Sequence, residues 1–173
     1  MTLKEYKVRL AQSTELKVLN DIEIAAGAQF RNFGFDFVAD MEPMPQIVLK
    51  ERLSANHLWV IARPGAPPVG FCCISIFDGL VHLEEVSVHP DFGRQGLGTL
   101  LVESLCKWAK ENGYPAVTLS TFLDIPWNAP FYSRLGFQVT AADKLGPWHL
   151  KIQAYETRLG LDKEKRVFMQ KIL

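Results

Sequence analysis

The residues of this sequence whose types and spacing most clearly suggest chemistry are three glycines, Gly93, Gly96 and Gly98, placed around Arg94 and Gln95. A glycine has no Cβ, so an anion can closely approach the main-chain N–H groups of such a turn. When a helix follows at once, about four of its first N–H groups lack partners and carry roughly half a positive charge. We therefore expect a binding site for phosphate groups at this turn.

The residues on either side predict which elements hold the turn. Before it, apolar and polar residues alternate over residues 80–88, which is typical of a strand with one buried face. Pro90 then ends the strand, because proline has no N–H to donate to a sheet. From Thr99 onward the apolar spacing becomes helical, with Leu100, Leu101, Leu105, Trp108 and Ala109 in the pattern. The predicted order is strand, glycine turn, helix.

Two familiar phosphate loops do not fit this turn. A nucleoside-triphosphate loop needs a glycine followed by Lys and then Ser or Thr, and no such pair is present. A dinucleotide fingerprint needs a further glycine where Leu100 and Leu101 stand. A tight strand-to-helix turn without any ligand remains an alternative when the glycines are considered alone.

A second stretch, Trp-Asn-Ala-Pro-Phe-Tyr-Ser-Arg-Leu-Gly-Phe at residues 127–137, supports a ligand-binding role. Together with Val-Ser-Val-His-Pro-Asp-Phe-Gly-Arg-Gln-Gly-Leu-Gly-Thr-Leu-Leu at residues 86–101, it resembles the GCN5-related N-acetyltransferase (GNAT) superfamily. There a [Gln/Arg]-x-x-Gly-x-[Gly/Ala] turn holds the pyrophosphate of acetyl-CoA, and a later helix ends in Tyr-x-[Lys/Arg]-x-Gly-Phe. The resemblance extends from about Tyr6 to Val167, and the two motifs in this order are more specific than either alone.

The resemblance implies acetyl-CoA as cosubstrate, with its pyrophosphate held by main-chain amides of the turn. One departure is visible, since Gly93 occupies the first motif position, where the family favours Gln or Arg. Main-chain pairing of a strand with the pantetheine arm is also implied. The cofactor-binding residues expected on this basis are Val86, Ser87, Val88, Gly93, Arg94, Gln95, Gly96, Leu97, Gly98, Thr99, Asn128, Phe131 and Tyr132.

The resemblance further implies attack of an amine on a thioester, which requires a base, donors to an oxyanion and a donor to the departing thiolate. Tyr132 matches the family's tyrosine and is expected beside the thiolate. The family often places the base on the central strand, where Glu84 and His82 match. Strand alternation puts Glu85 on the other face unless a bulge intervenes, and Glu85 is therefore a third candidate.

Composition sets wider limits. The 19 basic and 19 acidic side chains give a formal charge of zero, so nothing predicts a nucleic-acid or anionic-membrane partner. No apolar run reaches the roughly 20 residues of a membrane span, and the N-terminus lacks the apolar segment of a signal peptide. Cys72, Cys73 and Cys106 give no disulfide framework, and no Cys/His spacing predicts a metal. We expect a cytoplasmic monomer or homodimer without a metal.

We expect one domain, residues 1–173, of the α/β (α+β) class: the GNAT fold, with a mixed central sheet of about seven strands flanked by helices on both faces. Asp78-Gly79 predicts a hairpin turn, and the aromatic-rich residues 30–37 show no clear period. Expected strands are 6–10, 58–63, 69–77, 80–88, 116–121, 136–140 and 166–171. Expected helices run from Ser13 or Thr14 to Phe30 and over 46–53, 99–110, 129–135 and 148–159.

The acceptor is a primary amine of a small molecule or peptide in this interpretation. In the family its pocket lies between the first helices and the segment before the last strand, here residues 30–44 and about 145–159. Phe30, Phe33, Phe35, Phe37 and Trp148 suggest an apolar pocket, although a hydrophobic cluster under a loop fits equally well. The alternative function is a non-catalytic acetyl-CoA-binding sensor or interaction module.

Overall fold

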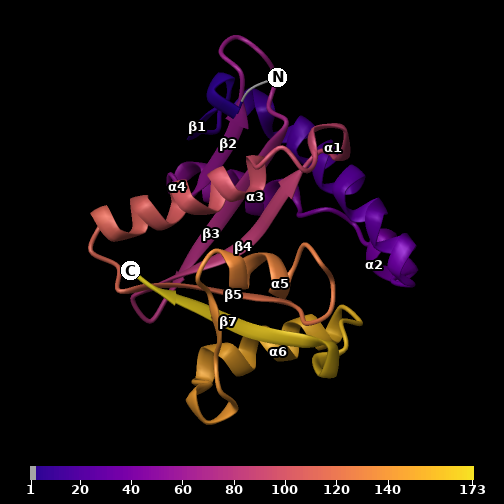
Figure 1. Ribbon diagram of the computed structural model, residues 1–173, viewed down its shortest axis with the longest axis vertical. Coiled ribbons are helices and arrows are strands. Elements are labelled where there is room, and N and C mark those ends of the chain that lie inside the picture. The colour runs from indigo at the N-terminus through magenta and orange to yellow at the C-terminus, as the bar shows by residue number, and fades with distance from the viewer. Residues whose placement is uncertain (1–2) are drawn as a thin grey trace. The chain divides into compact units, whose positions relative to one another are not determined.

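The computed structural model describes residues 3–173, which form a seven-stranded mixed sheet accompanied by helices (Figure 1). The hydrogen-bonded strand order is β1-β2-β3-β4-β5-β7-β6. The strands are β1 Lys7–Leu10, β2 Leu58–Ala62, β3 Gly70–Phe77, β4 Leu80–Val88, β5 Ala116–Phe122, β6 Gln138–Val139 and β7 Arg166–Ile172. Both the mixed sheet and the number of strands agree with the GNAT fold predicted from the sequence.

Internal contacts divide the chain into two compact units. Unit 1 contains the residues up to Ser75 together with Glu84–Leu105, and unit 2 contains Ile76–Leu83 together with Cys106–Leu173. The helices are α1 Leu16–Gly27, α2 Asp36–Ala39, α3 Gln46–Ser54, α4 Leu97–Glu111, α5 Ala129–Arg134 and α6 Pro147–Arg158.

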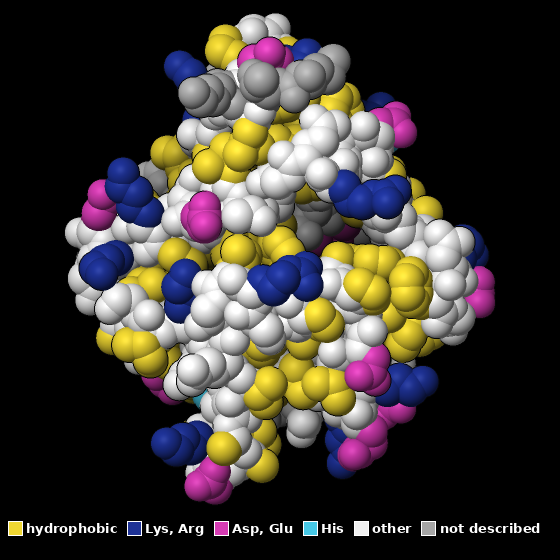
Figure 2. Space-filling view, in the orientation of Figure 1, with side chains coloured by type: hydrophobic (Ala, Val, Ile, Leu, Met, Phe, Trp, Pro, Cys, Tyr) yellow, Lys and Arg dark blue, Asp and Glu magenta, His cyan; other side chains and the backbone are white. Residues whose placement is uncertain are grey.

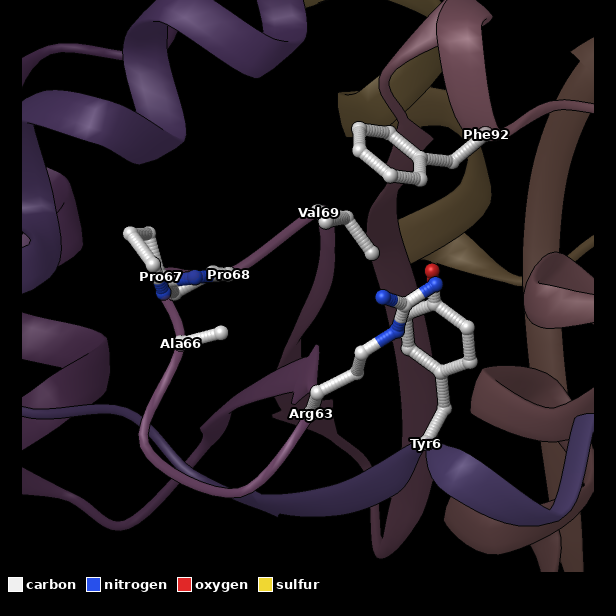
Figure 3. Close-up of a pocket in the computed structure, with 7 residues that line it drawn as sticks. All are labelled: Tyr6, Arg63, Ala66, Pro67, Pro68, Val69 and Phe92. Atoms are coloured by element: carbon white, nitrogen blue, oxygen red, sulfur yellow. The ribbon is translucent and has the colours of Figure 1, made fainter. Parts of the chain in front are cut away.

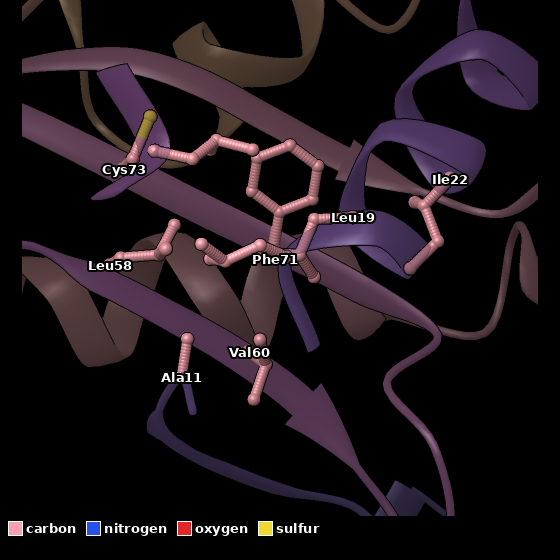
Figure 4. Close-up of a cluster of buried hydrophobic side chains, with 9 residues drawn as sticks. Ala11, Leu19, Ile22, Leu58, Val60, Phe71 and Cys73 are labelled. Atoms are coloured by element: carbon pink, nitrogen blue, oxygen red, sulfur yellow. The ribbon is translucent and has the colours of Figure 1, made fainter. Parts of the chain in front are cut away.

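The core of unit 1 lies between helices α1 and α3 and one face of strands β2 and β3 (Figure 4). Alternate positions of the two antiparallel strands point to that face, so Val60 lies opposite Phe71 and both are fully buried. Every residue of β2 is buried, which requires cover on the second face as well. The buried cluster comprises Ala11, Leu16, Leu19, Ile22, Leu49, Leu58, Val60, Phe71 and Cys73.

In unit 2, the first half of β4 pairs in parallel with β5, and β7 runs antiparallel to β5 along its whole length. Such a parallel pair needs a long crossover, which α4 supplies. An ion pair joins α6 to the start of β7, where Arg166 donates to both carboxylate oxygens of Glu156 at 3.0 and 2.8 Å. Glu156 also accepts from Ser120 of β5 at 3.0 Å, so one carboxylate connects three elements.

Several element boundaries differ from those expected. The long helix begins at Leu97 rather than Thr99, because the carbonyl of Gly96 already accepts from the amide of Leu100. The first helix ends as an α-helix at Gly27 and continues as a 3-10 helix to Phe33, and residues 36–39 form α2 where no period was visible. The strand expected over 136–140 keeps only Gln138–Val139, since Gly136 and Phe137 cap α5.

The hairpin turn between β3 and β4 is confirmed. Asp78 and Gly79 both have left-handed φ angles, 49° and 76°, as a two-residue turn of type I′ requires. Among residues 3–173, no helix has the length and apolar character that crossing a membrane requires. On the face in Figure 2, basic and acidic side chains are interspersed, in keeping with the zero formal charge.

Candidate functional site

The glycine turn of unit 1 presents its main chain to solvent. Arg94, Gln95 and Gly96 are exposed, whereas Leu97 is buried and fixes the first turn of α4. Arg94 and Gly96 have left-handed φ angles of 57° and 81°. Alternating main-chain conformations of this kind turn successive N–H groups toward a common concavity, which is a common way to bind an anion. The geometry therefore suits the phosphate site predicted from the glycines.

The segment before the turn is anchored to the sheet of unit 1. The amide of His89 donates to Val69 at the start of β3, at 2.8 Å, and Pro90–Phe92 form one turn of 3-10 helix. Gly93 then donates to the carbonyl of Pro90 at 2.9 Å, and a Cβ on Gly93 would lie only 3.0 Å from that oxygen. A glycine at position 93 thus lets the chain turn tightly, which explains why this position departs from the family's Gln or Arg.

The middle of β4 brings two acidic side chains to two different helices of unit 1. Both carboxylate oxygens of Glu84 accept from Arg52 of α3, at 2.6 and 2.9 Å, and each of these side chains is about one-fifth exposed. Hydrogen bonding to Glu84 is also the main reason why the pKa of Arg52 is raised. Glu84 is therefore part of a bidentate ion pair between strand and helix.

Glu85, the neighbouring residue, interacts instead with a carboxylate of α1. Its carboxylate accepts from Ser87 at 2.8 Å, and its charge acts on Glu23. Burial, and secondly the charge of Glu85, raise the pKa of Glu23 to about 8, although the main-chain amide of Met44 donates to both Glu23 oxygens at 3.0 Å. When two carboxylates lie close together in a buried position, one of them tends to keep its proton.

Glu84 and Glu85 are consecutive residues of β4, yet both have partners on helices of one layer. Arg52 and Glu23 belong to α3 and α1, which both pack on the same face of strands β2 and β3. A regular strand directs consecutive side chains to opposite faces, and a bulge is the usual way to direct two toward one layer.

Glu23 was missed by sequence reasoning. It lies in a helix that was predicted, but no motif includes it, and its neighbours Ile22 and Ile24 give only a general apolar pattern. The only available signal was an acidic residue within an apolar helical segment.

His82 lies in unit 2, where it is 5% exposed. Its Nδ1 is 3.0 Å from Thr118 Oγ1, and that hydroxyl donates to the carbonyl of Val81 at 3.1 Å. Because the hydroxyl has one hydrogen, the imidazole must donate from Nδ1, which leaves the lone pair on Nε2. Burial, assisted by the charges of His149 and Arg166, lowers the pKa of His82 to about 4. The ring is therefore neutral near pH 7.

Aromatic rings surround His82. Phe77 and Trp148 stack on each other with centroids 5.8 Å apart, and both meet the imidazole edge at 5.8 and 5.6 Å. Trp148, which was expected near an acceptor, thus belongs to an aromatic cluster of unit 2. In unit 1, the Phe30 and Phe35 rings pack edge to face with centroids 6.5 Å apart, while Phe33 and Phe37 are each 45% exposed.

Tyr132 is oriented by the end of helix α5. The amide of Phe137 donates to the carbonyl of Tyr132 at 3.1 Å, and the amide of Gly136 donates to Ser133 at 3.0 Å. This pair of bonds is a Schellman motif, which requires the left-handed φ of 88° at Gly136. The Phe137 ring packs against the Tyr132 ring at 5.7 Å. The Gly-Phe of the sequence motif therefore fixes the tyrosine that precedes it.

Asn128 begins helix α5 without capping it through its side chain. Its Oδ1 accepts instead from Thr121 Oγ1 at 2.6 Å and from the amide of Phe122 at 3.4 Å. Phe131 packs against Tyr132 at 5.1 Å. In unit 1, Ser87 is buried and Val86 and Val88 are half-buried on β4. Their roles toward a cofactor stay predictions.

Within residues 3–173, no group of three or more His, Cys, Asp or Glu side chains is arranged to hold a metal ion. Cys72, Cys73 and Cys106 are buried and form no disulfide.

Comparisons with known proteins agree with these motifs. The chain is 25% identical to the S-(2-succino)cysteine N-acetyltransferase of Bacillus subtilis over 158 residues, 84% of this chain and 92% of that one. It is 33% identical to streptothricin acetyltransferase A of Bacillus subtilis over 72 residues, a match that spans only 41% of each protein. A Mycobacterium tuberculosis protein solved in complex with CoA has the same fold, with a TM-score of 0.68 and 18% identity over 96% of this chain and 99% of that one. The model of the acetyltransferase (GNAT) family matches residues 23–137, and the chain therefore belongs to this family.

Proposed function

We propose that this protein transfers an acetyl group from acetyl-CoA to a primary amine by direct attack of the amine on the thioester. The observation that carries the proposal is the exposed turn at residues 94–96, with left-handed main chain at Arg94 and Gly96, in a chain of the GNAT family. Left-handed geometry at a glycine turn before a long helix suits a diphosphate.

The main chain of unit 1 does most of the cofactor binding in this proposal. Amides of residues 94–99 donate to the diphosphate, and the exposed Arg94 adds a charge-assisted bond. Val86 and Val88 offer main-chain groups to the amides of the pantetheine arm, in the manner of an added strand. Ser87 is buried between them and supports Glu85. In unit 2, Asn128 and Phe131 hold the tyrosine's helix in place.

Among the candidate bases, Glu85 together with Glu23 is best suited to deprotonate the acceptor. The pKa of Glu23 is about 8, so Glu23 is free to accept a proton from the ammonium once it has itself lost its proton to solvent, as the pH approaches 8. Transfer from an ammonium with a pKa of ~10 to such a group is uphill by about 3 kcal/mol. Glu84 is bound through both oxygens to Arg52, and the low pKa of His82 makes its ring a weaker acceptor.

Tyr132 is the proposed donor to the departing thiolate. With ordinary pKa values of ~10 for a tyrosine and ~8.5 for a thiol, full proton transfer is uphill by about 2 kcal/mol, a small part of a catalysed barrier. A hydrogen bond from the hydroxyl lowers the barrier even without transfer. The Schellman cap with Gly136 and Phe137 restricts the ring and so reduces the cost of aligning it.

The acceptor that we propose is a small molecule with a primary amine. The names of the two Bacillus relatives support this choice, since one is a streptothricin acetyltransferase and the other an S-(2-succino)cysteine N-acetyltransferase. A peptide amine is the next candidate. Three buried cysteines that form no disulfide support a reducing, cytoplasmic setting.

The test is release of free CoA thiol from acetyl-CoA in the presence of a panel of amines, which includes amino acids, S-substituted cysteines, polyamines, aminoglycoside-like compounds and short peptides. Turnover with at least one small amine, at a rate well above hydrolysis, supports the proposal. Tight binding of acetyl-CoA with no turnover on any member of the panel would instead identify a sensor.

A further inference from the structure

Unit 1 contains a small pocket whose lining includes none of the residues of the glycine turn and none of the carboxylates. It has a volume of about 280 Å³ and lies between the start of β1, the loop that joins β2 to β3, and the turn after β4 (Figure 3). This volume is at the low end for ligand sites in proteins, so a ligand would be small. The lining residues are Tyr6, Arg63, Ala66, Pro67, Pro68, Val69 and Phe92.

The hydroxyl of Tyr6 is the most informative atom of the pocket. The residue is 5% exposed, and its hydroxyl oxygen is buried without any hydrogen-bond partner. A buried hydroxyl without a partner costs about 1–3 kcal/mol, and native proteins contain few of them. Phenylalanine would fill the same space at no such cost. A hydroxyl kept at this position is explained by a ligand that accepts its hydrogen.

The guanidinium of Arg63 provides a charge beside that hydroxyl. It lies over the Tyr6 ring, with its central carbon 5.0 Å from the ring centroid, and Figure 3 shows both polar ends on the same side of the pocket. Its Nε forms an ion pair with a carboxylate oxygen of Glu5 at 3.7 Å, so an incoming anion would share the guanidinium with Glu5. The Arg63 side chain is one-third exposed, so it can turn toward an incoming anion.

The other lining residues are apolar. Pro67, Pro68 and Val69 form one wall, and the Phe92 ring forms the opposite one (Figure 3). Apolar side chains of this kind pack against the apolar part of a ligand. A guanidinium with a hydroxyl beside it complements a planar carboxylate. A phosphate with a polar body would leave these walls without a partner.

We propose that this pocket is a second binding site, for a small carboxylic acid with a branched aliphatic or aromatic body. The carboxylate pairs with Arg63 and accepts from the Tyr6 hydroxyl, and the body lies between the prolines and Phe92. The site is independent of the proposed acetyl transfer, because none of its residues belongs to the proposed machinery.

The experiment is a calorimetric titration of the protein with benzoate and isovalerate, and with benzamide and isovaleramide as uncharged isosteres. One of the acids should bind at least 10-fold more tightly than its amide. In Tyr6→Phe that affinity should fall about 10-fold, whereas resistance to heat should stay the same or rise, since the variant removes an unsatisfied hydroxyl. Arg63→Gln should weaken binding by 10-fold or more.

Arg158→Gln is the matched control, because Arg158 also lies over a tyrosine ring, that of Tyr155 at 6.0 Å, but in unit 2. It should leave the titration unchanged. Amide NMR signals of Ala66 and Val69 should shift with benzoate while those of α6 do not, a readout that needs no variant. Equal binding of acid and amide, unchanged affinity in Tyr6→Phe, or no binding of either acid would overturn the proposal.

Discussion

The glycine turn at residues 93–99 and the carboxylate group of Glu23, Glu84 and Glu85 both belong to unit 1, but they are built in opposite ways. In the turn, the useful groups are main-chain amides, and the side chains matter mainly through their absence at Gly93 and Gly96. In the carboxylate group, the side chains carry all the chemistry, and their properties come from partners on α1 and α3. One region depends on local conformation and the other on packing.

This difference determines how each region responds to substitution. A main-chain site fails when a new side chain changes φ and ψ, whatever the chemistry of that side chain. A packed carboxylate group fails, or changes its pKa, when a partner far away in the sequence is removed. The predictions below test these two kinds of dependence, starting from the largest expected effect.

Tyr132→Phe tests a third arrangement, in which a local main-chain cap fixes a reactive side chain. We expect kcat to fall about 100-fold with acetyl-CoA affinity unchanged, because a lost general acid typically costs at least that factor. Steady-state kinetics and calorimetric titration measure the two quantities. Tyr155→Phe, on the exposed part of α6, is the control and should keep full activity. An unaltered kcat in Tyr132→Phe would remove the tyrosine from the mechanism.

Gly96→Ala changes the glycine turn, and Gly113→Ala, just after helix α4, is its matched control. Both glycines have φ near 80°, and a new Cβ meets no atom closer than 3.6 Å at either position. Each alanine should therefore cost about 1–2 kcal/mol of stability through main-chain strain alone. Only Gly96→Ala should also weaken acetyl-CoA binding, by roughly 30-fold, because strain relief moves the amides of the turn. Equal affinities in the two variants would contradict the main-chain site.

The same contrast explains what the sequence could predict. The seven strands and the hairpin at Asp78-Gly79 follow from local rules of period and glycine conformation, and they were predicted within a few residues. The glycine turn was predicted from its own residues, whereas Tyr132 was carried over from the resemblance to the GNAT family, and its role stays a prediction.

Partners from distant segments were beyond such rules. Arg52 pairs with Glu84 across 32 residues, and Thr118 sets the tautomer of His82 across 36. Glu23 became a candidate only because it is buried and lies close to the charge of Glu85, in a position where it accepts from the amide of Met44. Helix α2 was missed for a related reason, since its four residues are too few to show a period.

Glu23→Gln tests the packed carboxylates through pH. Because the folded-state pKa of Glu23, about 8, lies above its ordinary 4.5, folding favours the neutral form. The stability that this provides is complete below pH 4.5 and is lost as the pH rises through 8. Wild-type stability should fall across that window, and Glu23→Gln should be flatter, with a gain on the order of 2 kcal/mol at pH 8.5.

Chemical denaturation at a series of pH values measures this difference, with Glu103→Gln, an exposed carboxylate of α4, as control. In the pH profile of kcat/KM, the inflection near pH 8 should shift in Glu23→Gln if Glu85 and Glu23 share the base function. A pH profile of stability that is parallel in wild type and Glu23→Gln would contradict the raised pKa.

Arg52→Gln should have the smallest effect and separates a structural carboxylate from a reactive one. It leaves Glu84, which is one-fifth exposed, without its bidentate partner, and we expect a loss of about 1–2 kcal/mol of stability, less than for a fully buried pair because solvent screens the charge. Lys107→Gln removes the exposed pairing with Glu111 on α4 and should change stability by less than about 0.5 kcal/mol. Since Glu84 serves packing in the proposed mechanism, kcat in Arg52→Gln should stay within about threefold of wild type at a temperature where the variant is folded. A much larger loss of kcat, together with a shifted pH profile, would return the base function to Glu84, and the ion pair with Arg52 would then regulate that base.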